Sequence, residues 1–379
     1  MPWPASLSQL LAMPDSRPGQ ALRWGLRGLR ASLQAVLDET ADDAGCAELR
    51  NLLGELEPLL TGGSLPTDFI LPPSDPVMPL DGSADTPRLL SLAQSAAEDA
   101  RLPERARRSL LQNTGDAELW SALQRLLLRQ PANLAKEWQE RSLKEAQGLG
   151  CRQDDSRSAA LPLPRDQVIY PGLSGPIEAP GLRARAGAAL DPRVGEPTEP
   201  DLRFLAGLVS TWLWFIENDD SLCHCLASVF RFGVTPLRGE QREQYTAELL
   251  RRWQRVRMVS GQSRADFRER LKAHLALDEA LHSLVYQPPA AADSWWGKLL
   301  NDARQVLFRV RDSAVQAGCA VHLQLLAGPF ADISQLAPDS LQVDFGAPGE
   351  VAVCLRIWAR IDGEEQKGRV LYRSPEDEA

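Results

Sequence analysis

Apolar residues recur at helical spacing over most of the chain and at two-fold spacing only near its C-terminus. In residues 1–60 leucines repeat every three or four positions in two blocks, which predicts a helical hairpin. The same period returns in residues 88–147 and again from residue 201. After Gly318 it changes to alternation, as in residues 351–357, which predicts strands. We therefore predict a mainly α-helical protein with a small C-terminal α+β unit that contains a short antiparallel sheet.

Proline and glycine interrupt this pattern twice. Both stretches have a composition that blocks helices and central strands, so we predict two linkers, of which the second is extended or partly disordered. The predicted order is a helical hairpin (1–60), a Pro/Gly-rich linker (61–87), a helical segment (88–147), a Pro-rich linker (148–200), a helical domain ending in a small antiparallel sheet (201–373) and an acidic tail (374–379).

The helical domain carries recognisable start and stop signals. Asp293 or Ser294 can cap its last helix and Gly318 can end it. Asp362-Gly363 predicts a tight turn, after which residues 368–373 can return beside the preceding strand. The predicted helices of this domain cover residues 201–217, 221–232, 239–259, 263–285 and 294–316.

Charge is unevenly distributed along the chain. The net charge of −9 argues against general binding to nucleic acid or to anionic lipid. Residues 238–272 reverse the sign, with ten Lys or Arg against five acidic residues. One interpretation is a surface that contacts a nucleic-acid phosphate backbone or an acidic protein, and the other is a solvated face held by ion pairs four residues apart. The centre of the basic helix would be Arg251, Arg252, Trp253 and Arg255.

Tryptophans supply the second surface signal. Trp295 and Trp296 are adjacent at a predicted helix start and cannot both face one core stripe, so at least one is expected at a domain junction or a partner surface. Trp358 falls between Arg356 and Arg360 on the strand face opposite the apolar one. We interpret this set as a protein-binding patch, with core packing as the alternative.

Candidate catalytic chemistry is sparse. The chain lacks a Gly-X-Ser-X-Gly elbow, a phosphate-binding loop and a dinucleotide fingerprint. Cys223-His224-Cys225, with His274 and His282 downstream, could hold a metal only if the segment were not helical, because a helix points residues two positions apart to nearly opposite sides. We therefore predict no catalytic residue, no metal and no cofactor.

The sequence carries no sign of secretion or membrane insertion. Its six cysteines lack the spacing of a disulfide framework, and no stretch reaches the roughly 18 apolar residues of a membrane span. We expect a cytoplasmic protein with reduced thiols.

Two functions are consistent with these patterns. The first is a non-enzymatic adaptor or structural subunit of a cytoplasmic multiprotein assembly, whose partners are other protein subunits. The alternative is a nucleic-acid-binding accessory subunit, for example of a bacterial defence or DNA-processing complex, that uses the basic helix. An enzyme that depends on cysteine or metal would require a non-helical Cys223 segment.

Overall fold

A computed structural model shows the arrangement of the chain. It describes Leu33, Leu37, Cys46 and residues 49–54, 87–111, 113, 115–260 and 267–375. The chain forms two compact units, residues 1–81 and 82–379. The described residues of the first unit are helical. The rest of the predicted hairpin, the predicted linker 61–87 except Pro87, and residues 376–379 of the predicted tail lie outside the described residues.

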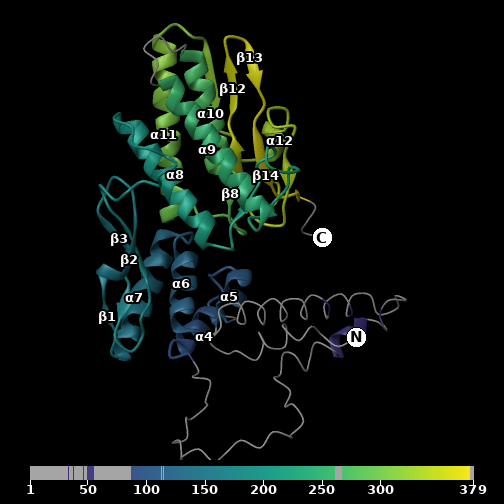
Figure 1. Cartoon of the computed structure of the whole chain (residues 1–379). Helices are drawn as coiled ribbons and strands as arrows, with labels where there is room; N and C mark the ends of the chain where they lie inside the picture. The colour runs from purple at the N-terminus through teal and green to yellow at the C-terminus, as the bar shows by residue number, and fades with distance from the viewer. Residues whose placement is uncertain are drawn as a thin grey trace, which may run out of the picture. The chain divides into compact units, whose positions relative to one another are not determined.

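Residues 87–184 of the second unit, here the first lobe, combine four helices with short strands (Figure 1). The core of this lobe contains Trp120, whose indole packs edge-on against the ring of Tyr170 at 5.0 Å. The elements are α4 (Leu90–Glu98), α5 (Glu104–Leu110), α6 (Asp116–Leu127), α7 (Ala132–Gly148), β1 (Arg152–Gln153), the 3-10 helix η1 (Asp155–Arg157), β2 (Ser158–Leu161), β3 (Gln167–Tyr170), β4 (Leu173–Ser174) and β5 (Gly181–Ala184).

The structure differs from the sequence prediction over residues 148–200, where a linker was expected. Strands β1 to β5 occupy residues 152–184, in a two-stranded sheet and a three-stranded sheet of order β2-β5-β3. Pro162, Pro171 and Pro180 lie directly outside strands β2, β3 and β5 and limit their lengths without preventing them. Proline density was therefore a signal of strand ends here.

Residues 200–375 are called the second lobe here. This lobe begins with helix α8, and later elements of the lobe pack against that helix. Figure 1 shows α9 and α10 running side by side within this lobe. The elements are α8 (Pro200–Asn218), β6 (Cys223–His224), β7 (Thr235–Pro236), α9 (Glu240–Ser260), α10 (Phe267–His282), β8 (Leu284–Val285), α11 (Trp295–Gln316), β9 (Val321–Gln324), α12 (Phe330–Ile333), β10 (Leu341–Gln342), β11 (Val351–Arg356), β12 (Trp358–Ile361), β13 (Glu364–Gln366) and β14 (Arg369–Tyr372).

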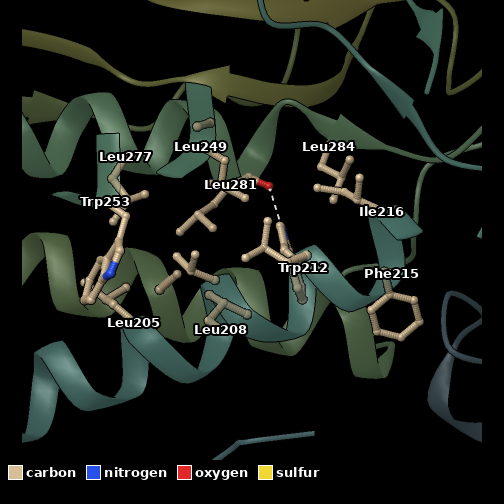
Figure 2. Packing of buried hydrophobic residues seen from close by; sticks show 14 of the residues in the cluster. Leu205, Leu208, Trp212, Phe215, Ile216, Leu249, Trp253, Leu277, Leu281 and Leu284 are labelled. Atoms are coloured by element: carbon tan, nitrogen blue, oxygen red, sulfur yellow. Dashed lines mark hydrogen bonds between the residues drawn. The ribbon is translucent and has the colours of Figure 1, made fainter. Parts of the chain in front are cut away.

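Helix α8 forms the centre of the largest hydrophobic cluster. Pro200 begins it, and 12 of its 19 residues are buried. Figure 2 shows Leu205, Leu208 and Trp212 of this helix among apolar side chains of the cluster. Trp212 is fully buried, stacks on Trp296 with ring centroids 4.1 Å apart, and donates its Nε1–H to the carbonyl oxygen of Leu281 at 3.2 Å. At Gly207 an added β-carbon would overlap the carbonyl oxygen of Pro162 in the first lobe. Close packing thus joins α8 to both lobes.

The predicted fold class is wrong. Five small sheets are spread over residues 152–372, so the protein is mixed α/β rather than mainly α with one C-terminal sheet. Two of the strand pairs, β2 with β5 and β10 with β14, are parallel, whereas only antiparallel pairing was expected. Most of these strands have two to four residues. A two-fold period cannot be recognised over so few positions.

Within the second lobe, the sequence signals for helix ends and turns located some elements correctly and others wrongly. The cap was located correctly, because Ser294 Oγ accepts from Gly297 N at 3.0 Å and Gly318 takes φ 95° after α11. Asp362 and Gly363 form the predicted turn, with φ 50° and 87°, but its second arm is β13, and β14 pairs with β11 instead. The predicted helix 221–232 is absent from the described fold, which has β6 and turns there. A short apolar run does not distinguish a strand from a helix.

The buried His274 on α10 makes stability depend on pH. Burial lowers the pKa of His274 from 6.5 to about 4, against the smaller opposing effect of a hydrogen bond between its Nδ1 and the Arg270 carbonyl oxygen at 2.8 Å. Between pH 6.5 and 4 the unfolded chain binds a proton that the native protein does not, so the free energy of unfolding falls as pH falls, by roughly 3 kcal/mol from this group.

We predict that His274→Gln removes this part of the pH dependence, because glutamine keeps a donor without titrating. Urea unfolding of both proteins between pH 7 and pH 4 measures the difference in slope. Asp278, whose pKa burial raises to about 6, has the opposite dependence but is common to both proteins. Equal slopes in the two proteins would contradict the assignment.

Candidate functional site

Trp358 lies in the core, not on an open sheet face. Strand β11 ends at Arg356 and β12 begins at Trp358, so the alternation expected across both is broken at Ile357. The Trp358 side chain is 4% exposed, and its Nε1–H donates to Glu365 Oε1 at 2.6 Å. His322 packs edge-on against the ring, and the Arg360 guanidinium lies over it at 5.1 Å. The expectation of an exposed tryptophan is therefore wrong.

We predict that Trp358→Ala destabilises the protein by about 3–5 kcal/mol, because it removes a large buried side chain and leaves a cavity. Chemical denaturation followed by tryptophan fluorescence and by circular dichroism measures the loss. Arg360→Ala, which removes only the exposed cation above the ring, is the control and should change the unfolding free energy by about 1 kcal/mol or less. An unchanged denaturation midpoint for Trp358→Ala would contradict the assignment of Trp358 to the core.

The predicted basic helix corresponds largely to α9, and its three central arginines form ion pairs with carboxylates of α9 and α10. Trp253 is fully buried and donates to the carbonyl oxygen of Val194 at 2.9 Å. Arg252 is buried, with Nε bonded to Glu248 Oε1 at 2.7 Å. Arg251 pairs with the same Glu248 at 2.7 Å, and Arg255 pairs with Glu269 at 2.8 Å. Of the four candidate residues, only Arg251 and Arg255 are exposed, and nucleic-acid binding stays a prediction.

Glu279 on α10 joins Arg252 and Arg356, which the sequence analysis assigned to separate surfaces. Its carboxylate contacts Arg252 at 3.0 Å, Arg356 at 3.4 Å and Arg369 at 3.1 Å. These arginines come from α9, β11 and β14, so one buried carboxylate ties two helices to a sheet. Arg356 belongs to this network, which removes it from the predicted surface patch.

We predict that Glu279→Gln lowers the free energy of unfolding by about 3–5 kcal/mol, because it leaves three clustered guanidinium groups without their common counter-charge. Glu269→Gln is the matched control. It affects one exposed pair and should cost about 1 kcal/mol or less. Urea denaturation of the three proteins at one ionic strength checks this, and equal midpoints for both variants would show that the network is not a structural centre.

The two adjacent tryptophans separate into different environments. Trp296 is buried between Trp212, Phe215 and Tyr286, whereas Trp295 is half-buried and lines a groove of about 630 Å³. The groove lies where α7 and the β2–β3 connection of the first lobe meet α8 and α11 of the second. Its apolar part includes Leu163, Ile169, Phe204, Trp295 and Leu299.

Charged groups surround this apolar surface. Arg309 and Asp201 pair with each other at 2.7 Å, and Asp293 Oδ2 accepts from Ala132 N at 3.1 Å. Arg165 and Lys298 are exposed. The lining has four basic residues, Lys136, Arg165, Lys298 and Arg309, against three acidic ones, Asp201, Asp293 and Asp302. The rim is therefore mixed with a small positive excess.

The Cys223 segment is β6 and not a helix, so the geometric argument against a shared metal does not apply. Among the described residues, no group of three or more His, Cys, Asp or Glu side chains could hold a metal ion. Burial raises the pKa of Cys225 and of Cys354, which keeps both thiols protonated near neutral pH. Neither cysteine is prepared to act as a nucleophile.

Asp278 forms a second buried polar cluster on α10. Its carboxylate lies 3.2 Å from His282 Nδ1 and 3.6 Å from Arg304 Nε, and burial raises its pKa to about 6. The neighbouring cavity measures only about 10 Å³. That volume accommodates about one water molecule and no substrate, so this cluster is part of the interior.

Sequence patterns did not identify the groove or a second, polar cleft near Arg129, because both are assembled from segments far apart in the chain. Of the groove residues, the sequence analysis had proposed Trp295 for binding.

Comparisons with protein-family models, curated proteins and solved structures gave no match for this chain. A search of the helices within the described residues found none with the length and apolar character needed to cross a membrane.

Proposed function

We propose that this protein is a non-enzymatic docking subunit of a cytoplasmic multiprotein assembly and that it binds a segment of a partner protein in the groove beside Trp295. The observation that carries the proposal is the half-buried Trp295 in an apolar groove of about 630 Å³ between two packed lobes. Partly exposed tryptophans in such grooves are typical anchors of protein interfaces.

The lining favours binding over chemistry. Its residues include no cysteine and no histidine among those described. Tyr170, its one phenol, is bonded to Ser142 at 2.8 Å, and burial raises the pKa of Tyr170. An apolar surface with a charged rim instead provides contact area and orientation.

Charge and shape define the occupant. The exposed cations Arg165 and Lys298 have no carboxylate within 4 Å among the described residues, while the acidic Asp201 is already paired. We therefore propose an apolar protein segment flanked by acidic residues, with one large side chain against Trp295 and its carboxylates facing the exposed cations.

A displayed library of random peptides tests this directly. Selection on the full-length protein, with counter-selection on Trp295→Glu, should enrich apolar segments flanked by Asp or Glu. Affinities of the enriched peptides are then measured by fluorescence anisotropy. Trp295→Ala should weaken them by about thirtyfold, equivalent to ~2 kcal/mol for loss of an aromatic anchor.

Trp214→Ala is the matched control, because Trp214 is also half-buried but does not line the groove. Its affinity for the peptides should equal that of the native protein. No enriched peptide, or equal affinity for Trp295→Ala and Trp214→Ala, would reject the docking proposal. Salt-sensitive binding of DNA or RNA that is lost on Arg251→Glu with Arg255→Glu, in the absence of peptide binding, would favour the nucleic-acid alternative.

A further inference from the structure

A second concave site is lined by Arg129, the residue that follows the groove residue Leu128. It is a polar cleft of about 820 Å³ between the end of α6, the turn after α8 and the turn before α9. Charged side chains dominate its lining. They are Glu104, Arg108, Arg125, Arg129, Asp219, Asp220 and Arg238.

Asp219 is the fixed acidic group of the cleft. Its side chain is 1% exposed and accepts from Ser221 N at 3.0 Å, Ser221 Oγ at 2.7 Å and Tyr286 Oη at 3.0 Å. Arg125 Nε lies 3.7 Å from the same carboxylate. Asp219 therefore has its donors and its counter-charge within the protein.

Arg129 is the unusual group, because it is a cation placed in the interior without a carboxylate partner. Its side chain is held over the Tyr286 ring at 4.6 Å, and the residue is 8% exposed. Its Nε has no hydrogen-bond partner, and within the described part of the chain no carboxylate lies within 4 Å of its guanidinium. Burial lowers the pKa of Arg129 by penalising its charged form. A desolvated guanidinium of this kind is costly unless an anion is present.

When the charged residues that line the cleft are matched with their nearest partners, some of the arginines have no carboxylate partner in the described part of the chain. Arg108 pairs with Glu104, and Arg125 lies nearest Asp219. Asp220 is paired with Arg242, which comes from α9. Two arginines of the lining, Arg129 and Arg238, then have no carboxylate within 4 Å among the described residues. Arg129 follows α6 and Arg238 precedes α9, so the two lining arginines come from distant parts of the chain.

We propose that this cleft binds a small molecule through a phosphate group, with Arg129 at its base and Arg238 at its mouth. A guanidinium donates two parallel N–H groups to one oxyanion, and the several oxygens of a phosphate can accept from two arginines at once. The cleft is larger than a phosphate ion alone needs, so the remaining volume accommodates the organic part of a phosphate ester. This site is separate from the groove of Trp295 and does not depend on it.

Isothermal titration at constant ionic strength tests the proposal on the full-length protein. The probes are inorganic phosphate, glycerol 3-phosphate, adenosine monophosphate and, as the uncharged comparison, adenosine. We expect the esters to bind more tightly than inorganic phosphate, and adenosine not to bind. Arg238→Gln should weaken ester binding by about tenfold, equivalent to ~1.4 kcal/mol. Arg231→Gln, which removes an exposed arginine outside the cleft, should bind as the native protein does.

Arg129→Gln should abolish binding, and the melting temperature of the ligand-free variant shows whether it folds. If it does not fold, Arg238→Gln decides the question, because Arg238 is exposed and carries no core packing. The proposal is overturned if none of the phosphate compounds binds, if Arg238→Gln and Arg231→Gln bind equally, or if chloride at the same ionic strength reproduces the heat and thermal stabilisation seen with the esters.

Discussion

The burial of helix α8 is the constraint on which the rest of the structure depends. Twelve of its 19 residues are buried, and they are distributed around the helix rather than along one stripe. Such a helix cannot lie on a surface, so other elements must cover it on all sides. Helices α9, α10 and α11 and strands β2 and β5 do so, with the Trp212–Trp296 stack at the centre of the contact. Strands β2 and β5 belong to this cluster, whereas the C-terminal strands pack in separate clusters that contain no residue of α8.

Several charged side chains are buried together with the helices that carry them. The arginines of α9 look like a surface feature when they are counted along the chain, yet Arg252 points inward and meets Glu279 from α10. Glu279 in turn gathers Arg356 and Arg369 from two strands. A buried carboxylate with several arginines exchanges solvation for mutual attraction, so the intact network adds little net stability although loss of its carboxylate is costly. Of the basic residues in 238–272, Arg252 takes part in this contact, whereas Arg242, Arg251 and Arg255 pair with other carboxylates.

Both proposed binding sites are lined by residues of both lobes, and they meet one short connection at the adjacent residues Leu128 and Arg129. Trp296 N donates to the carbonyl oxygen of Leu128 at 3.1 Å, and Ala291 N donates to that of Arg129 at 2.9 Å. Leu128 lines the groove of Trp295, whereas Arg129 lines the polar cleft. The groove is mostly apolar and the cleft mostly polar, so the two sites present chemically different surfaces. This placement agrees with the tendency of ligand sites to form where packed units meet.

The sequence by itself determined the long helices and their ends. Helices α8, α9 and α11 carry enough turns for a period to be visible, and Ser294 and Gly318 act through local backbone chemistry. Only the tertiary structure decided the rest. Strands of two to four residues are stabilised by partners distant in the chain, as when Leu161 of β2 pairs with Ala184 of β5. Burial depends on what packs against a residue and not on its neighbours in sequence. For this reason only the tertiary structure showed that Trp358 is in the core, that Trp295 and Trp296 differ in burial, and that Arg129 is buried without a carboxylate partner among the described residues.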